Sequence, residues 1–264
     1  MNVSHDQYLR FVSNGLLDDV LSFHAKGNYV IHSTTQHFST LHHVPASDLQ
    51  KLSGVELSLD PLPPPEGRIS PLLCASPLQP DHPLRRNDSC DHFQPRPMTF
   101  ETVKEIIAPL LRKTSDSKRG YPSGGGIYPI EVFCVNVGDR IEGWPGETNA
   151  LHLLAASKTF ETHSPLIDAR KLSCSITPLN TQIGSPTLAL VYCMYLPKAL
   201  FKYRYRGYRL ALMEVGSMYM LTDLRCKELS LDSRPWAGFT DHQVTKSLNL
   251  NPALFLTICI QLIG

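Results

Sequence analysis

Residues 121–137, YPSGGGIYPIEVFCVNV, join a glycine-rich loop to a short run of apolar and β-branched residues. From Ile130 to Val137, apolar side chains occupy both sets of alternating positions, a pattern typical of a strand that is buried on both faces of a sheet. Residues 187–196, TLALVYCMYL, have the same pattern. The two segments therefore predict strands inside one central sheet.

Sequence patterns typical of helices precede and follow these strands. A helix is expected to begin after Thr99, a residue suited to the N-cap, and to kink or end at Pro109. A second long helix is expected over residues 208–229 and a short one from residue 240 or 241, before a last strand over residues 254–264. The order of these elements predicts an α+β fold. The apolar residues that recur on one face of the first helix are Phe100, Val103, Ile106, Ile107, Leu110 and Leu111.

The composition of the 264-residue chain narrows the possible functions. Its 25 Lys and Arg nearly balance 24 Asp and Glu, which argues against a protein that neutralises many nucleic-acid phosphates. The seven cysteines are scattered and form no C-x-x-C pair, so we expect reduced thiols rather than a metal or redox site. Neither a signal peptide nor an apolar run long enough to cross a membrane is visible. We expect a cytoplasmic protein.

The chain is predicted to have three parts. Residues 61–97 are rich in proline, which favours an extended connection between an N-terminal segment, residues 1–60, and a main domain, residues 98–264. Five of the six histidines in the N-terminal segment have a spacing that matches no compact set of metal ligands, so no metal site is predicted and a surface or partner-facing role is favoured. These histidines are His24, His32, His37, His42 and His43.

The glycine-rich loop is the first candidate site. Backbone N–H groups of Gly124, Gly125 and Gly126 can approach a flat or anionic ligand because no Cβ stands in the way. Lys118 and Arg119 precede the loop and would supply positive charge for a phosphate. The spacing fits neither a P-loop nor a Rossmann fingerprint. A plain connecting turn remains the alternative.

The second candidate site is residues 198–209, KALFKYRYRGYR, where cations alternate with aromatic rings. Such a strip could bind nucleic acid, because cations meet phosphates and rings stack on bases. It could be catalytic, because a nearby ammonium group such as Lys202 favours the phenolate form of Tyr203. It could also be a solvated surface. Adjacent residues on a strand point to opposite faces, so this pair can cooperate only if the backbone is bent or helical there.

Three motifs in order resemble a known family: KRGYPSGGGIYPIEVF at 118–133, ALFKYRYRGYRLALMEVGSMY at 199–219 and WAGFTD at 236–241. Together they resemble the flavin-dependent azoline dehydrogenases of thiazole/oxazole-modified microcin biosynthesis, a branch of the nitroreductase-like FMN flavoproteins. The resemblance covers the chain from about residue 100 onward, with a weaker match at residues 23–29. It implies a nitroreductase-like α+β fold, with a mainly antiparallel sheet flanked by helices, in a homodimer with FMN at the subunit interface.

The resemblance also implies roles for individual residues. Lys202 and Tyr203 match the pair to which the family's catalytic proton transfer is assigned. Arg206 is a candidate for the FMN phosphate or for a carboxylate such as Glu214. The residues that match family positions near the flavin are Arg119, Pro122, Ser123, Gly124, Gly125, Trp236, Ala237 and Gly238.

The sequence departs from the family pattern in two places. Met220 and Leu221 replace a usual Gln-Asn, and Ser230 and Leu231 replace a usual Gly-Leu. A family contact to flavin or to the neighbouring subunit that used the Gln or Asn side chain is absent in this chain. The Lys-Tyr pair is intact.

The family chemistry implies partners. Azolines must be formed before they are oxidised, so a precursor peptide and the cyclodehydratase subunits of a synthetase complex are expected, without nucleic acid or membrane. Residues 1–60 are a candidate docking surface, and a solvated extension is the alternative. Two other functions remain: an NAD(P)H-dependent flavin reductase of quinones or nitro compounds, and, less favoured, a nucleic-acid-binding module.

Overall fold

The structure is a computed structural model that describes residues 5–28, 44–45, 47–48, 76–113, 118–162, 168–178 and 182–264. The chain forms two compact units, one of residues Met1–Tyr29 with Arg86–Gly264 and one of Val30–Arg85. All the elements named below belong to the first unit. No helix among the described residues is long and apolar enough to span a bilayer.

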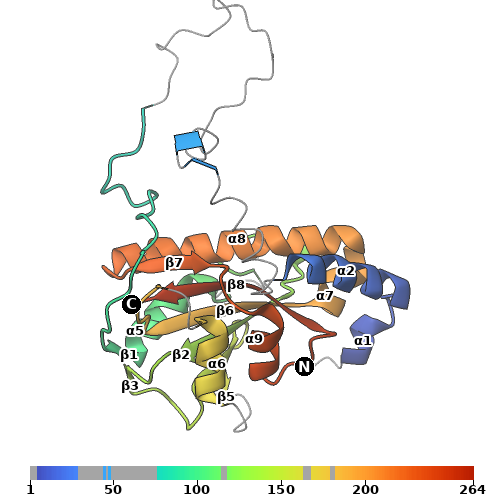
Figure 1. The fold of residues 1–264 in the computed structure, drawn as a ribbon. Helices are drawn as coiled ribbons and strands as arrows, with labels where there is room; N and C mark the ends of the chain where they lie inside the picture. The colour runs from blue at the N-terminus through green and yellow to red at the C-terminus, as the bar shows by residue number, and fades with distance from the viewer. Residues whose placement is uncertain are drawn as a thin grey trace, which may run out of the picture. The chain divides into compact units, whose positions relative to one another are not determined.

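A six-stranded sheet forms the centre of the first unit (Figure 1). The strand order is β5-β4-β2-β6-β8-β7, and all neighbouring strands pair antiparallel. This confirms the predicted central, mainly antiparallel sheet. A separate parallel pair joins β1 (Met98–Thr99) to β3 (Ile141–Glu142). The six strands are β2 (Ile130–Asn136), β4 (Ala150–Leu154), β5 (Thr159–Thr162), β6 (Leu188–Tyr195), β7 (Ser233–Trp236) and β8 (Phe255–Ile263).

Both faces of the sheet are covered, as the doubly apolar strands require. On one face, Val132 and Tyr192 belong to a core shared with α5 (Phe100–Ile107) and α8 (Tyr205–Glu228). On the other face, Phe133 and Val191 pack in a second core with α6 (Ala169–Ile176) and α9 (Asp241–Ser247). In Figure 1, α8 runs along one side of the sheet while α6 and α9 lie on the other. The sheet is therefore the middle layer of three.

Local signals explain where the helices begin and end. The Thr99 side chain caps α5 by accepting a hydrogen bond from the Thr102 N–H at 3.2 Å, as expected. A 3₁₀ turn, η3 (Ala108–Leu110), follows α5 and contains Pro109. Asp168 caps α6 by accepting from the Lys171 N–H at 3.0 Å. The predicted helix after Thr99 and its end at the proline are both confirmed.

The cation-rich strip spans two helices rather than one. Helix α7 (Leu196–Tyr203) ends at Tyr203, and α8 begins at Tyr205, three residues before the predicted start. Arg204 between them has a φ of 49°, in the left-handed region that a non-glycine residue rarely adopts. The chain therefore turns sharply inside the strip, so no single helical face continues through it.

The N-terminal helices α1 (His5–Leu9) and α2 (Asn14–Gly27) pack against α7 and α8. His24 Nδ1 lies 3.0 Å from the Tyr208 hydroxyl, and the Tyr205 hydroxyl donates to Asp19 at 2.5 Å. Part of the predicted segment 1–60 thus belongs to the same compact unit as the main domain. Of the five histidines considered from the sequence, the other four, His32, His37, His42 and His43, lie outside the described residues.

The chain before β1 is extended but firmly attached. Residues 76–97 contain no helix or strand beyond a one-residue bridge at Phe93, as their prolines predict. Arg86 pairs with the buried Asp223 of α8 at 2.7 Å. Phe93 is buried, and its N–H donates to the Ile183 carbonyl at 2.8 Å. Residues 86–97 are therefore tied to α8 and to the chain before β6.

Candidate functional site

The glycine loop lies immediately before β2 and is held in place from both sides. The Ser123 hydroxyl accepts a hydrogen bond from the Tyr128 N–H at 2.8 Å across the turn η4 (Gly124–Gly126). Before the loop, Arg119 donates from its side chain to the Tyr121 hydroxyl at 2.9 Å, and its guanidinium lies 4.6 Å from the centre of the Tyr128 ring. Both tyrosines flank the loop, so these contacts fix its shape.

The loop contacts the Lys-Tyr pair directly. A Cβ built on Gly125 would lie 2.5 Å from the Tyr203 hydroxyl and 3.1 Å from Lys202 Nζ. A Cβ on Gly124 would lie 2.9 Å from a methyl group of Leu210, whereas one on Gly126 would meet nothing within 4 Å. The structure thus brings two motifs that are far apart in the sequence into one site.

The backbone at Lys202 and Tyr203 is helical, which is what the two neighbouring side chains need in order to cooperate. Both lie in the last turn of α7, and Lys202 Nζ is 5.3 Å from the centre of the Tyr203 ring. The chain turns away at Arg204 directly after them. The pair can therefore act on one side of the backbone, next to the exposed backbone of Gly125.

The exposed cations of the strip are free of carboxylate partners within the described part of the chain. Lys202, Arg204, Arg206 and Arg209 are all exposed, and none forms an ion pair there. Arg206 in particular does not pair with Glu214, one of the two partners considered from the sequence. The strip therefore presents positive charge to solvent beside the glycine loop.

A partly buried network of charges lies beside the loop and was not predicted. Glu131, the second residue of β2, accepts from His152 Nε2 at 3.1 Å and pairs with Lys198 of α7 at 3.5 Å. His152 Nδ1 lies 2.6 Å from Glu161 of β5. Burial alone would raise the pKa of Glu131, but the hydrogen bond from His152 and the charge of Lys198 lower it to about 2. Burial alone would lower the pKa of His152, yet Glu131 and Glu161 raise it.

Glu214 of α8 is the second buried acid beside the loop. Its side chain is 2% exposed, and neither carboxylate oxygen meets the geometry of a hydrogen bond to any described residue. Burial raises the pKa of Glu214 to about 7, against the opposing effects of the Ser123 hydroxyl, Arg119 and Lys198. Ser123, Gly124, Tyr203, Leu210 and Glu214 contribute to the wall of one small cavity of about 10 Å³.

One sequence signal could have identified Glu131. It is the only acidic residue in the otherwise apolar and neutral strand that follows the loop. An acid in such a strand needs a partner. His152, its partner, comes from a strand that the sequence pattern did not reveal.

Three of the predicted residues lie apart from the loop within this chain. Trp236 is the last residue of β7, and its indole N–H donates to the Ile176 carbonyl at 2.9 Å. Strand β7 is the third strand from β2 in the sheet, a separation of about 14 Å at the usual spacing between strands. Ala237 and Gly238 follow Trp236, and Gly238 lies against its ring. One copy of the chain does not bring these residues to the glycine loop.

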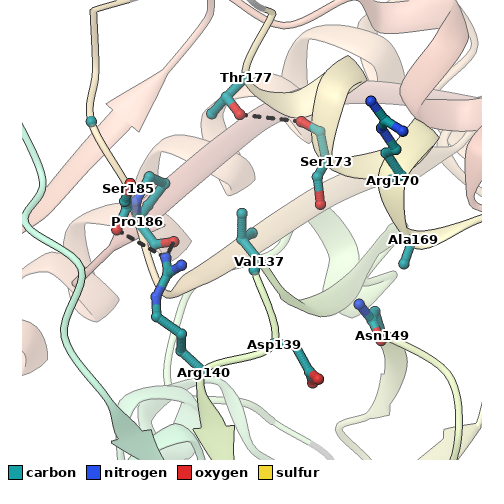
Figure 2. A pocket seen from close by; sticks show the side chains of 12 residues that line it. Val137, Asp139, Arg140, Asn149, Ala169, Arg170, Ser173, Thr177, Ser185 and Pro186 are labelled. Atoms are coloured by element: carbon teal, nitrogen blue, oxygen red, sulfur yellow. Dashed lines mark hydrogen bonds between the residues drawn. The ribbon is translucent and has the colours of Figure 1, made fainter.

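A larger cavity of about 380 Å³ lies at the other end of β2. Figure 2 shows that the Arg140 side chain turns toward the carbonyls of Ser185 and Pro186, to which it donates hydrogen bonds at 3.0 and 2.5 Å. The other labelled residues come from the turn after β2, from the residue before β4, from α6 and its C-terminal end, and from the chain before β6. None of the residues predicted from the sequence lines this cavity. The candidate site is therefore the glycine loop with the Lys-Tyr pair.

No family model matches the chain. Known proteins nevertheless resemble it along most of its length. The chain is 32% identical over 254 residues to the microcin B17-processing protein McbC of Escherichia coli, a match that covers 93% of this chain and 89% of that protein.

This chain belongs to the microcin-processing azoline dehydrogenases. A chain of the E. coli microcin synthetase McbBCD complex, solved with truncated pro-MccB17 bound, has the same fold. Its TM-score is 0.82 at 31% identity, and the match covers 100% of this chain and 97% of that one. The family resemblance stated from the sequence is thus confirmed, and the protein is an oxidoreductase.

The azoline dehydrogenase also shares its fold with a more distant protein. A crystal structure from Ralstonia eutropha, described as a nitroreductase, matches with a TM-score of 0.54 at 17% identity. The match covers 67% of this chain and 78% of that one. At this level of identity the likeness concerns the fold alone, and it confirms the predicted nitroreductase-like architecture.

Proposed function

We propose that this protein oxidises thiazolines and oxazolines of a peptide to thiazoles and oxazoles, with FMN as cofactor, during maturation of a microcin-like peptide. The observation that carries the proposal is the contact of Gly125 with Lys202 and Tyr203. It joins the two family motifs to which cofactor binding and proton transfer are assigned. The relationship to McbC supports the same conclusion.

The residues at the loop fit a flavin. Gly125 and Gly126 are exposed and carry no side chain, so their backbone offers a flat surface beside the Lys-Tyr pair. FMN, when bound, supplies a group that accepts a hydride. We assign Pro122, Ser123, Gly124 and Gly125 to the ring. The positive charge for the phosphate would come from Arg119 and Arg206, which lie before the loop and on the exposed face of α8.

The chain's own residues must manage a proton. Aromatisation of an azoline removes two electrons and two protons, so one hydrogen leaves as a proton when the other leaves as a hydride. We assign Tyr203 as the group that takes this proton. Lys202 Nζ stands 5.3 Å from the centre of the Tyr203 ring, so a positive charge lies beside the group that takes the proton.

We further propose that the protein is a homodimer that joins its copies along α8. This helix exposes an apolar stripe in which Met213 is 62% exposed, with Gly216 and Ser217 allowing close approach. A second copy would supply what one copy lacks at the loop, including the segment from Trp236 to Gly238. Met220 lies in the same stripe, where family members carry a Gln. The exposed apolar residues of α8 are Leu212, Met213 and Met220, with the exposed ring of Tyr205 near the start of the helix.

The protein's partners follow from its chemistry. We propose that it acts in the cytoplasm, in a synthetase with cyclodehydratase subunits and a precursor peptide. The solved McbBCD complex with truncated pro-MccB17 supports this proposal. Residues 1–60 remain the candidate docking surface. Because α2 packs on α8, removing residues 30–60 alone is the better test, and full co-purification of that variant with the cyclodehydratase would contradict a docking role for residues 30–60.

The decisive experiment compares two reactions of the purified, FMN-loaded protein. A peptide that carries azolines should lose about two mass units per ring, because two hydrogens leave each ring. A flavin reductase, the function that the nitroreductase-like fold also permits, would instead oxidise NAD(P)H with a quinone. Turnover of the quinone without any oxidation of the peptide would favour that alternative.

A further inference from the structure

Glu214 is a buried acid with weak partners, because the Ser123 hydroxyl and the Ile130 N–H lie near its carboxyl group without meeting the geometry of a hydrogen bond. Within the described part of the chain, both of its carboxylate oxygens lack a hydrogen bond, although the residue is only 2% exposed. Asp223, another buried acid of α8, shows the usual arrangement, with bonds to Arg86 and to the Ser233 hydroxyl. Burying a carboxyl group without partners costs stability, so Glu214 calls for an explanation beyond packing.

The position of Glu214 suggests what it does. It shares the wall of the 10 Å³ cavity with Tyr203, Ser123 and Gly124. A volume of about this size is the lower limit for one water molecule. The hydroxyl of Tyr203 lies against Gly125, the residue next to Gly124, which lines the cavity.

We propose that Glu214 accepts, through one water molecule in this cavity, the proton that Tyr203 removes from the azoline. The inference rests on the proposed function. As the C–H bond of the ring breaks, its hydrogen passes as a proton to the Tyr203 oxygen, while a proton moves from the bridging water to Glu214. Water regains a proton from Tyr203, which becomes a phenolate again. The net change is one ionised carboxylate converted to a carboxylic acid, which then releases the proton to solvent.

The charges around Glu214 suit this role. Arg119 faces it from the segment before the loop and Lys198 from α7, and both favour the ionised form that must accept a proton. Burial opposes them by favouring the uncharged carboxyl group. Glu131 of β2 and Tyr121 lie among the same charged groups. Because these effects oppose one another, the carboxyl group can both take up and release a proton near neutral pH.

The test uses the FMN-loaded full chain and its Glu214→Gln variant, which keeps the shape of the side chain but cannot accept the proton. The rate of single-turnover azoline oxidation by the parent should rise with pH and level off above about pH 7. This rise is the acid limb of the pH–rate profile. The variant should be slower by about 10²-fold and should lack this limb. Glu214→Asp should keep the limb at a reduced rate. A Gln variant with the parent's rate and acid limb would overturn the inference. If the Gln variant does not fold, an Asp variant with the parent's rate would overturn it instead.

A matched control separates proton transfer from structure. Asp223→Asn removes a buried acid of the same helix that has partners, so it should lower the melting temperature and leave the acid limb unchanged. Loss of the limb in this variant would overturn the assignment to Glu214. If the parent itself, loaded with FMN, oxidises no azoline, the proposed function fails first and the inference with it.

A measurement without substrate or flavin gives an independent check. The pKa of Glu214 is raised on folding, so its contribution to stability is full below the unfolded pKa and is lost as pH rises through about 7. Glu214→Gln removes this loss. The melting temperature of the variant relative to the parent should therefore increase as pH rises from about 5 to about 8. A difference that does not change with pH would show that Glu214 does not titrate there and would overturn the inference.

Discussion

The hydroxyl of Tyr203 lies so close to the backbone of Gly125 that a Cβ on residue 125 would fall 2.5 Å from the phenolic oxygen. Gly125 also has a φ of 65°, in the region that favours glycine. Two separate physical reasons thus require glycine at this position. The loop and the Lys-Tyr pair form one unit, because neither can move without the other.

Gly125→Ala should therefore do more harm than Gly126→Ala. Both glycines have a positive φ, so alanine should cost about 1–2 kcal/mol of backbone strain at either position. Only the Cβ at residue 125 displaces Tyr203, because the one at residue 126 meets nothing within 4 Å. A small displacement of a catalytic group can cost about 10²-fold in rate. The rate of azoline oxidation, compared at equal flavin content, should fall by this factor in Gly125→Ala but not in Gly126→Ala. Equal losses of rate in the two variants would contradict this account.

The pair of His152 and Glu131 should make stability depend on pH. The lowered pKa of Glu131 gives stability that is present above its unfolded value near about 4.3 and is lost as pH falls toward 2. The raised pKa of His152 gives stability that is present below about 6.5 and is lost as pH rises through its folded pKa. The pair therefore stabilises most between these limits.

His152→Gln tests this dependence. The difference in the free energy of unfolding between parent and variant should shrink as pH rises from about 6 to about 8, as measured by urea titration. His92→Gln is the control, because His92 is an exposed histidine that bonds only to a backbone carbonyl among the described residues. If the difference for His152→Gln stays constant over this range, the ion pairs do not stabilise the fold as described.

The sequence predicted the elements that have strong and simple patterns. Strands β2 and β6 and helices α5 and α8 were located within a few residues, because their apolar positions are many and regular. Strand β7 was missed since Pro235 argues against a strand, yet prolines are tolerated at a sheet edge, where β7 lies. Helix α2 was missed because only Leu16 and Val20 of its fourteen residues are buried.

The sequence could predict only those parts of the site that lie within a single motif. The loop and the Lys-Tyr pair were both identified from the sequence, but their contact depends on how α7 meets the loop. The charge network depends on strand register, since His152 lies opposite Phe133 on β2 and Glu161 on β5. Periodicity within one segment carries no information on such pairing. Glu214 was noted as a carboxylate, and only its burial reveals it as an unpaired one.

The exposed apolar stripe on α8 predicts a dimer interface. A charged residue introduced there should dissociate the dimer. Met213→Lys places an ammonium group in the middle of the proposed interface, where its desolvation is costly. Sedimentation at several protein concentrations should show a shift toward monomer, and the flavin content should fall with it. Glu142→Lys, a charge change on an exposed residue away from α8, should leave the mass unchanged. A Met213→Lys variant that remains dimeric with full flavin would place the interface elsewhere.

The sharpest prediction separates the chemistry of Tyr203 from its packing. Tyr203→Phe removes only the hydroxyl, which makes no hydrogen bond to any described residue, so flavin content and melting temperature should change little. The loss of a group that takes a proton in the rate-limiting step typically costs about 10²- to 10⁴-fold in rate. Lys202→Ala should also slow oxidation, because the positive charge beside Tyr203 is lost.

The double variant shows whether the two residues act as a unit. If Lys202 works through Tyr203, removing both should cost little more than removing Tyr203 alone, since effects within one catalytic unit are not additive. Cyclised but unoxidised peptide should accumulate in all three variants, heavier than the product by about two mass units per ring. If Tyr203→Phe oxidises azolines at the parent's rate with its flavin bound, the proton passes to another group. The contact between Gly125 and Tyr203 would then shape the flavin site without taking part in the chemistry.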